Sequence, residues 1–505
     1  MIFPMEVNQL KTGAILSYIT IILNTLVGIL YTPFMLRMMG QNEYGLYSLA
    51  ASIISYLTIL DLGFANALVR YTSKYRAENK EEKLPSMYGM FFLLYLVIGL
   101  LAAVIGFALF LNVENLFNAT MSNEELLKVK IMMLILTFNL AFTFPMSIWG
   151  AIITAYERFV FQKMVNIIRI ICNTGVMICL LLLGYKSIAL VIVLTIFNII
   201  TLLLNYVYCK SKLKVKVQFR KFNWNFLKEV AKYSFWIFLN AIVDRVYWGS
   251  GQFVLGIYAG AKAIAVYALA IQLQGMYDSF SNAISSVFFP RITKLVVEKN
   301  EKAISDLFIR IGRIQFYVMA LILSGFIVFG KQFIFLWAGE SYSDTYYICL
   351  YFFIPLVVPL IQNLGIHIMQ AYKKVQFRAI LYIVVAIFSL TLSIMLAPKY
   401  EGIGCAIATC IGLCIGHILI MNLYYYFSLK IDIPKFWRQI GKIAIVPICI
   451  ALLFTYLKTV IDISNIINYV IMVACYILLF CVTMYLFILN DYEKQIFHLK
   501  KRKND

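Results

Sequence analysis

Long apolar stretches separated by short polar connections follow one another along the whole chain. A helix that crosses a membrane takes roughly 20 residues, and fourteen stretches are long enough. They cover residues 12–36, 44–69, 86–111, 129–154, 160–184, 187–209, 231–257, 264–290, 311–337, 344–370, 376–397, 402–427, 440–458 and 465–489. Unbroken apolar runs such as Ile131–Ala141 lack the alternation of an outer-membrane barrel strand. The pattern therefore predicts an all-α polytopic membrane protein with about 14 transmembrane helices.

Short motifs recur in the same order in the two halves of the chain. Tyr47-Ser-Leu-Ala50 reappears as Tyr267-Ala-Leu-Ala270, 220 residues later. The connection that opens Ala155-Tyr156-Glu-Arg158 reappears as Ala371-Tyr372-Lys-Lys374, at an offset of 216. Ordered matches at nearly constant offsets indicate an internal duplication, which is common in transporters.

The duplication predicts a division of the chain into lobes. We expect an N-lobe at residues 1–215 with spans one to six and a C-lobe at 216–430 with spans seven to twelve. Residues 431–505 then hold two peripheral spans and a basic cytoplasmic tail. Because six is even, both lobes enter the membrane in the same direction, so we expect a pseudo-twofold axis along the bilayer normal and a substrate pathway between the lobes.

Composition agrees with a membrane protein and excludes most soluble classes. Hydrophobic residues make up 62% and charged residues 13% of the chain, whereas soluble proteins have about 25% charged residues. The net charge is +20. When the N-terminus is placed in the cytoplasm, 34 Lys and Arg fall in cytoplasmic segments and 8 on the other side. This asymmetry predicts cytoplasmic termini, and it accounts for the charge without nucleic acid as a partner.

Motifs of catalysis and metal binding are missing from the sequence. No phosphate-binding G-x-x-x-x-G-K-[ST] loop and no C-x-x-C pair occurs, and no connection is long enough to form a soluble domain. We therefore expect a secondary transporter in the bacterial cytoplasmic membrane, without catalytic residues, metal or other cofactor, rather than an enzyme.

Polar residues inside the apolar spans need an explanation, because a charge near the bilayer centre costs at least about 2.5–3.5 kcal/mol. Four spans carry polar residues at helical spacing, which together predict a hydrated cavity. The four sets are Asn166, Arg169 and Asn173; Asn240, Asp244 and Tyr247; Gln274, Asp278, Ser281, Asn282 and Ser285; and Asn363, His367 and Gln370. Asp61 and Arg245 are further charges inside spans.

These residues suggest two kinds of role. A deep arginine suits a phosphate or carboxylate, because its guanidinium stays charged and offers forked donors. The predicted substrate-binding residues are Arg245, Arg169, Asn166, Asn173, Gln274 and Asn282. The residues predicted to couple transport to H+ or Na+, or else to pair internally, are Asp61, Asp244, Asp278 and His367. For Arg245 an internal ion pair with Asp278 or Asp61 is the alternative, and for His367 an interhelical hydrogen bond is favoured over proton relay.

The first two spans contain Asn24, Pro33, Leu36-Arg37, Gly40, Glu43-Tyr-Gly-Leu-Tyr47 and Asp61-Leu-Gly63. Together with Asp244-Arg245, the two Ala-Tyr-basic connections and Tyr400-Glu-Gly-Ile-Gly404, these residues resemble the polysaccharide-repeat-unit flippases of O-antigen and capsule synthesis. That family is a branch of the multidrug/oligosaccharidyl-lipid/polysaccharide (MOP) exporter superfamily.

The resemblance implies flipping of an undecaprenyl-diphosphate-linked oligosaccharide from the cytoplasmic to the outer leaflet by ion-coupled alternating access. Membrane lipids and other polysaccharide assembly proteins would be its partners. A flippase for the lipid-linked peptidoglycan precursor and a cation-coupled multidrug exporter are the alternatives. A membrane-embedded glycan polymerase or ligase fits less well, because no non-cytoplasmic connection exceeds about 20 residues.

Overall fold

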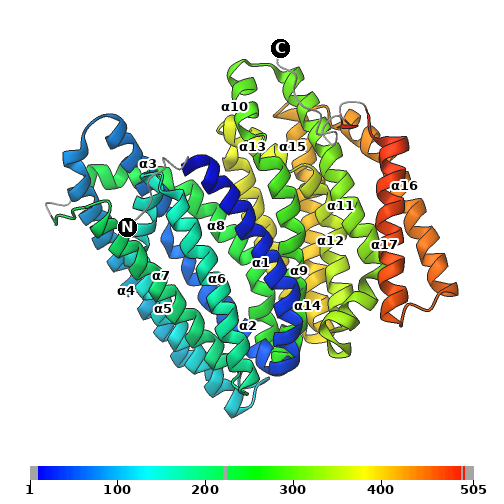
Figure 1. Ribbon diagram of the computed structural model, residues 1–505, viewed down its shortest axis with the longest axis horizontal. Coiled ribbons are helices and arrows are strands. Elements are labelled where there is room, and N and C mark those ends of the chain that lie inside the picture. Colours follow the sequence, from blue (N-terminus) through cyan, green and yellow to red (C-terminus); the bar gives the residue numbers. More distant parts are fainter. Residues whose placement is uncertain (1–8, 220–223, 491–492, 495–505) are drawn as a thin grey trace. The chain divides into compact units, whose positions relative to one another are not determined.

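The computed structural model describes residues 9–219, 224–490 and 493–494, and every regular element in this part of the chain is a helix (Figure 1). Helices follow from the apolar runs, because a segment inside a bilayer must satisfy its backbone hydrogen bonds internally. The predicted all-α polytopic fold is confirmed. The side chains of several residues in the first and eighth helices, Asn240 and Asp244 among them, lie outside the described part.

The first half of the chain forms eight α-helices and two 3₁₀ turns. Their bounds are α1 (Gln9–Met39), α2 (Gln41–Leu57), η1 (Thr58–Asp61), α3 (Phe64–Ala77), η2 (Glu81–Lys83), α4 (Leu84–Phe117), α5 (Asn123–Ala155), α6 (Phe159–Leu182), α7 (Ser187–Ser211) and α8 (Trp224–Tyr258).

The second half continues with nine α-helices, one 3₁₀ turn and two π-helical segments, η4 and η5. Their bounds are α9 (Ala261–Ser286), α10 (Phe289–Val297), α11 (Glu301–Ala338), η3 (Glu340–Tyr342), α12 (Asp344–Ile361), α13 (Leu364–Ala371), α14 (Val375–Leu413), η4 (Cys414–Ile420), α15 (Met421–Phe427), α16 (Ile433–Val460), α17 (Ile466–Thr483) and η5 (Met484–Ile488).

Eleven helical segments of the described chain are long and apolar enough to cross a membrane. The segment Val375–Phe427 counts once among them, although its backbone leaves helical geometry at Glu401 and the sequence predicts two spans there. Helices α8 and α9 are not among the eleven. The polar stripe of α9 lowers its mean hydropathy. The protein is thus a multi-pass membrane protein, but the exact count of fourteen spans is not confirmed by this criterion.

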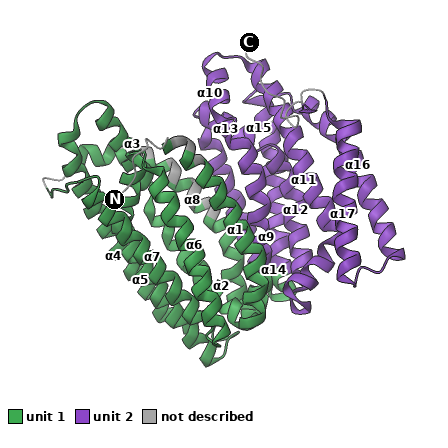
Figure 2. Ribbon diagram, viewed as in Figure 1, with its two compact units in different colours: residues 1–268, 397–402 green, residues 269–396, 403–505 purple. Residues whose placement is uncertain are grey.

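The chain divides into two compact units (Figure 2). Unit 1 comprises Met1–Ala268 with Ala397–Gly402, and unit 2 comprises Leu269–Leu396 with Ile403–Asp505. In unit 1, α5 packs against α2, α3, α4 and α7; in unit 2, α11 packs against α12 and α16. The division follows contacts rather than repeats, so the lobe boundaries inferred from the duplication stay a prediction.

The duplication also appears in the backbone as turns of matching geometry. Four pairs of residues with positive φ recur at offsets of 216 or 220, and within each pair the φ angles differ by at most 3°. The pairs are Gly40 and Gly260, Asn79 and Lys299, Glu157 and Lys373, and Lys214 and Lys430. Non-glycine residues adopt positive φ rarely. Recurrence of this conformation at the offsets of the sequence motifs therefore supports the internal duplication.

Candidate functional site

Asp61 lies where the second predicted span is broken. Helix α2 ends at Leu57, the η1 turn follows, and Leu62 and Gly63 adopt left-handed conformations with φ of 52° and 73° before α3 begins. The carboxylate accepts a hydrogen bond of 2.6 Å from the hydroxyl of Tyr95 on α4 and another from the backbone N–H of Gly63. It thus lies at the positive N-terminal end of α3, which favours an anion.

Helix α6 carries the predicted polar face of unit 1. Arg169 donates a 3.0 Å hydrogen bond to Oδ1 of Asn166, and both side chains are half-buried. One helical turn further on, Asn173 donates to the sulfur of Met177 at 3.5 Å, while its Oδ1 is buried without a partner among the described residues. The structure therefore brings these three predicted residues together on one helix face. No described carboxylate pairs with Arg169.

Arg245 lies on α8, and its side chain is exposed. The structure records no ion pair between Arg245 and any described residue of unit 1, so the alternative of a pair with Asp61 has no support there. The neighbouring side chains of Asn240 and Asp244 lie outside the described residues. Their predicted roles stay predictions.

Helix α9 carries the predicted polar stripe of the second half. Gln274 is buried and donates a 2.5 Å hydrogen bond to Oδ2 of Asp278, one turn later on the same helix. Asn282 is exposed, and its Oδ1 accepts a 2.7 Å hydrogen bond from Asn363. Gln274 is therefore engaged inside unit 2, whereas Asn282 keeps an exposed side chain that a solute can reach.

The same stripe stabilises a break in the tenth predicted span. Helix α12 contains Pro355 and Pro359 and ends at Ile361, and α13 starts three residues later. Ser281 donates a 2.7 Å hydrogen bond to the carbonyl of Leu360, whose backbone bond at the break is a long one of 3.4 Å from the N–H of Asn363. The hydroxyl of Ser281 also accepts bonds of 3.0 Å and 3.2 Å from the side chains of Gln315 and Asn363. These contacts explain polar residues here as stabilisers of an irregular backbone.

His367 makes its hydrogen bond within its own helix. Its Nδ1 lies 3.2 Å from Oε1 of Gln370, three residues later on α13, and its ring lies 5.4 Å from that of Phe289 on α10. A hydrogen bond to a neighbouring helix, the favoured interpretation from sequence, is not recorded among the described residues.

Two polar clusters are not apparent from the sequence alone. Arg313 on α11 donates to Oε1 and Oε2 of Glu493 at 2.7 Å and 2.9 Å, and Glu493 is 1% exposed. Burial would raise the pKa of Glu493, but hydrogen bonds from Arg313 and from the backbone N–H of Asn490 hold it below its ordinary value. Because 180 residues separate the partners, no local pattern could predict the pair.

The second cluster explains part of the Glu43–Tyr47 motif. Glu43 is 6% exposed; it accepts from Lys128 on α5 at 2.7 Å and from Ser187 on α7 at 2.5 Å. Two residues later, Gly45 faces the first residue of α9: a Cβ at this position would lie 1.9 Å from the carbonyl oxygen of Ala261. The motif thus fixes close helix packing rather than ligand chemistry.

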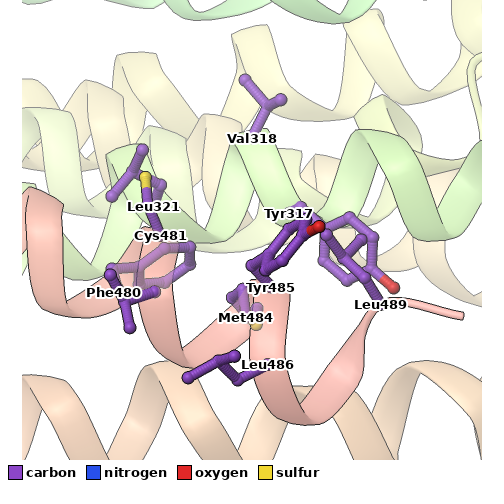
Figure 3. Close-up of a pocket in the computed structure, with 10 residues that line it drawn as sticks. Tyr317, Val318, Leu321, Phe480, Cys481, Met484, Tyr485, Leu486 and Leu489 are labelled. Atoms are coloured by element: carbon purple, nitrogen blue, oxygen red, sulfur yellow. The ribbon is translucent and has the colours of Figure 1, made fainter. Parts of the chain in front are cut away.

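An apolar pocket of about 540 Å³ lies in unit 2 between α11 and the end of α17 with η5 (Figure 3). Its lining is Tyr317, Val318, Leu321, Phe480, Cys481, Val482, Met484, Tyr485, Leu486 and Leu489. This lining contains no charged side chain, so the pocket does not suit a diphosphate. Among the residues that the structure describes, no cluster of three or more His, Cys, Asp or Glu could hold a metal.

Comparison with known proteins adds to this picture. Residues 10–296, more than half of the chain, match the family described as "Polysaccharide biosynthesis protein". The chain belongs to this polysaccharide biosynthesis family. The chain is 21% identical over 406 residues to a Shigella flexneri protein named as an O-antigen transporter. The match covers 79% of this chain and 94% of that protein. It is also 21% identical over 414 residues to the membrane protein EpsK of Bacillus subtilis, covering 80% of each.

Solved structures show the fold of this family member to be that of the MOP superfamily. The lipid II flippase MurJ in an inward closed conformation matches with a TM-score of 0.71 at 20% identity, over 96% of the chain and 99% of MurJ. An inward-facing multidrug transporter of the superfamily matches with a TM-score of 0.63 at 13% identity, over 82% of the chain and 99% of the transporter. The Shigella flexneri relative, MurJ and the multidrug protein are named as transporters or flippases rather than enzymes. The predicted resemblance to the polysaccharide branch of the MOP superfamily is confirmed at the level of family and fold.

Proposed function

We propose that the protein moves an oligosaccharide linked to a lipid diphosphate from the cytoplasmic to the outer leaflet of the bacterial cytoplasmic membrane. The mechanism would be alternating access driven by H+ or Na+, with both termini in the cytoplasm. Support comes from the polysaccharide biosynthesis family and from the name of the Shigella flexneri relative, an O-antigen transporter.

The observation that carries this proposal is that two arginines of unit 1 lie far from the ends of long apolar helices. Arg169 lies ten residues after the start of α6, or roughly 15 Å, and Arg245 lies thirteen residues before the end of α8, or roughly 20 Å. Neither forms an ion pair with a described residue of unit 1. A diphosphate needs its charge compensated while it crosses the hydrocarbon, and two guanidinium forks provide suitable donors.

Amide side chains of each unit suit sugar hydroxyls. Asn166 and Asn173 share the face of Arg169, and the buried Oδ1 of Asn173 has no partner among the described residues. In unit 2 the exposed Asn282 suits direct contact with a glycan better than Gln274, which is buried against Asp278.

Coupling to an ion gradient would use the intramembrane acids. Asp61 lies at a helix break beside Tyr95, and Asp278 is bonded to Gln274. Either carboxylate could exchange H+ or Na+ during the cycle, and Asp244 and His367 are further candidates. A transport assay in vesicles under an imposed H+ gradient and, separately, an imposed Na+ gradient would distinguish the two ions.

A lipid-linked peptidoglycan precursor is the second candidate substrate, because the fold matches the lipid II flippase MurJ over nearly the whole chain. A multidrug substrate is favoured less, since the fold match to the multidrug transporter is lower, with a TM-score of 0.63.

Deletion of the gene in its host tests the proposal. We expect lipid-linked repeat units to accumulate on the cytoplasmic leaflet and surface glycan to be lost, with both restored by the wild-type gene. Arg245→Ala should fail to complement at normal expression, and Arg245→Lys should complement partly. Arg291→Ala, which removes an exposed arginine of α10, should complement fully. Accumulation of peptidoglycan precursor, or altered drug resistance with normal surface glycan, would contradict the proposal.

A further inference from the structure

A short segment without helical structure, residues 212–219, follows α7, and its side chains alternate between two environments. Its apolar residues pack against the hydrophobic core of unit 1: Leu213, Val215 and Val217. Its basic residues are exposed: Lys212, Lys214 and Lys216. We call this segment the basic strap.

Backbone contacts hold the basic strap against the end of α7 and the start of α4. The N–H of Val215 donates to the carbonyl of Cys209 at 3.0 Å, and the N–H of Gln218 donates to the carbonyl of Pro85 at 2.9 Å. A Cβ at Gly89 would lie 2.2 Å from the carbonyl oxygen of Gln218, so the strap crosses α4 at a position where only glycine fits. The lysines are therefore displayed from a fixed backbone rather than from a free loop.

No acidic residue among those that the structure describes pairs with the lysines of the strap. The sequence contains neither Asp nor Glu between Glu157 and Glu229. None of the three strap lysines forms an ion pair with another described residue. Like charges held close together repel one another, which destabilises the strap unless an external anion compensates them.

The internal duplication supplies a comparison within the same chain. In the second half, the N–H of Ile431 donates to the carbonyl of Tyr425 at 3.0 Å, which repeats the Val215–Cys209 bond at an offset of 216. The backbone at Lys430 is left-handed, as it is at Lys214. Residues 428–432 thus repeat the backbone of residues 212–216, and we call them the second strap.

The two straps differ in how their charge is compensated. Asp432 takes the place of Lys216 in the second strap. Lys430 there pairs with Glu301 at 3.1 Å, and Lys435, in the first turn of α16 that follows, pairs with Asp306 at 3.0 Å. The lysines at the second strap are therefore paired with carboxylates of the protein itself. The lysines of the basic strap in unit 1 are left for an anion from outside the protein.

We infer that the basic strap is a binding surface for the head groups of anionic phospholipids at the membrane–water interface. The strap lies between two long helices of a multi-pass membrane protein, so it stays near the head groups. Phe219 at the end of the strap and Trp224 at the start of α8 are 63% and 66% exposed, and exposed aromatic residues are typical of the membrane interface. Lysines at an anionic membrane surface each contribute about 1 kcal/mol, which corresponds to roughly fivefold in affinity.

The test uses the full-length protein in neutral phosphatidylcholine nanodiscs with increasing fractions of phosphatidylglycerol. Bound phosphatidylglycerol is counted by native mass spectrometry, and the melting temperature is followed in parallel. We expect the wild type to bind and be stabilised by phosphatidylglycerol. The triple variant K212Q/K214Q/K216Q should lose affinity on the order of a hundredfold, from three steps of roughly fivefold.

The second strap provides the matched control. K430Q/K435Q also removes exposed lysines, but it breaks internal ion pairs, so it should leave the phosphatidylglycerol response intact. The response should weaken as salt is raised. Unchanged lipid binding in the triple variant would overturn the inference. So would equal stabilisation of the wild type by soluble inorganic pyrophosphate or by RNA, because the strap would then be a general anion site.

Discussion

Gly45 offers the sharpest test of the packing in unit 1. A Cβ at Gly45 would lie 1.9 Å from the carbonyl oxygen of Ala261, and real Cβ contacts essentially never fall below 3.0 Å. The Gly45→Ala variant must therefore separate α2 from the first turn of α9 by at least 1.1 Å, the difference between these two distances. The carbonyl oxygen of Ala261 belongs to the backbone, so it cannot rotate away from the new methyl group as a flexible side chain could.

The expected effect is a balance of two terms. Alanine is more favourable than glycine in a helix by about 0.8–1 kcal/mol. Overpacking of a close contact typically costs about 1–3 kcal/mol, and the upper part of this range applies because the contact atom belongs to the backbone. We expect a net destabilisation of about 1–2 kcal/mol, which lowers the melting temperature by roughly 2–4 °C per kcal/mol in a domain of a few hundred residues.

Thermal unfolding of the purified protein in detergent measures this effect. Gly441→Ala is the matched control, because Gly441 on α16 has no atom within 4 Å of the position of its Cβ. The control should be as stable as the wild type or slightly more stable. A Gly45→Ala variant that is also as stable as the wild type would refute the close approach of α2 and α9.

Three further predictions concern the polar contacts and the topology. Glu493→Ala should cost about 1.5–3 kcal/mol of stability, because the half-buried Arg313 loses its carboxylate partner and keeps only neutral ones such as Tyr317 and Gln439. Since the pKa of Glu493 is lowered in the folded state, its contribution should be full at neutral pH and should be lost in melting curves as the pH falls through that lowered pKa. Ser281→Ala should cost about 1–3 kcal/mol, because it removes the hydroxyl that bonds the carbonyl of Leu360 and the buried amides of Gln315 and Asn363, whereas Ser279→Ala on the exposed face should change stability little. A cysteine at Glu124 should react with an impermeant thiol reagent from outside the cell and one at Lys214 should not, and the reverse labelling would contradict cytoplasmic termini.

Much of the fold could be predicted because apolar runs and repeats are local patterns. The helical class follows from runs such as Ile188–Leu204, and the offset that relates Tyr47 to Tyr267 reappears in the paired turns at Gly40 and Gly260. The breaks inside spans could not be predicted in the same way. The chain turns at Leu62, a residue that gives no sign of a left-handed conformation in a hydropathy pattern.

The residues of the candidate site were harder to predict from the sequence than the fold. A polar residue inside a span can contact a substrate, pair with another side chain or satisfy an irregular backbone, and its position in the sequence does not distinguish these roles. The sequence groups Asn166 with Arg169 correctly, since helical spacing places them on one face. It also interprets Ser281 as part of a cavity, whereas the structure uses its hydroxyl to satisfy the carbonyl of Leu360. To distinguish these roles one must know which helix packs against the polar residue. That helix can be far away in the sequence, so no local pattern reveals it.

Reconstitution tests the central claim most directly. The purified protein is inserted into vesicles that contain an undecaprenyl-diphosphate-linked oligosaccharide with a fluorescent tag, and the fraction of tag accessible to a membrane-impermeant quencher is followed under an imposed ion gradient. The account predicts that the wild type moves the lipid-linked glycan between leaflets, that Arg245→Ala abolishes the movement, and that Arg291→Ala does not. Movement at the wild-type rate in the Arg245→Ala variant, or none above protein-free vesicles in the wild type, would contradict it.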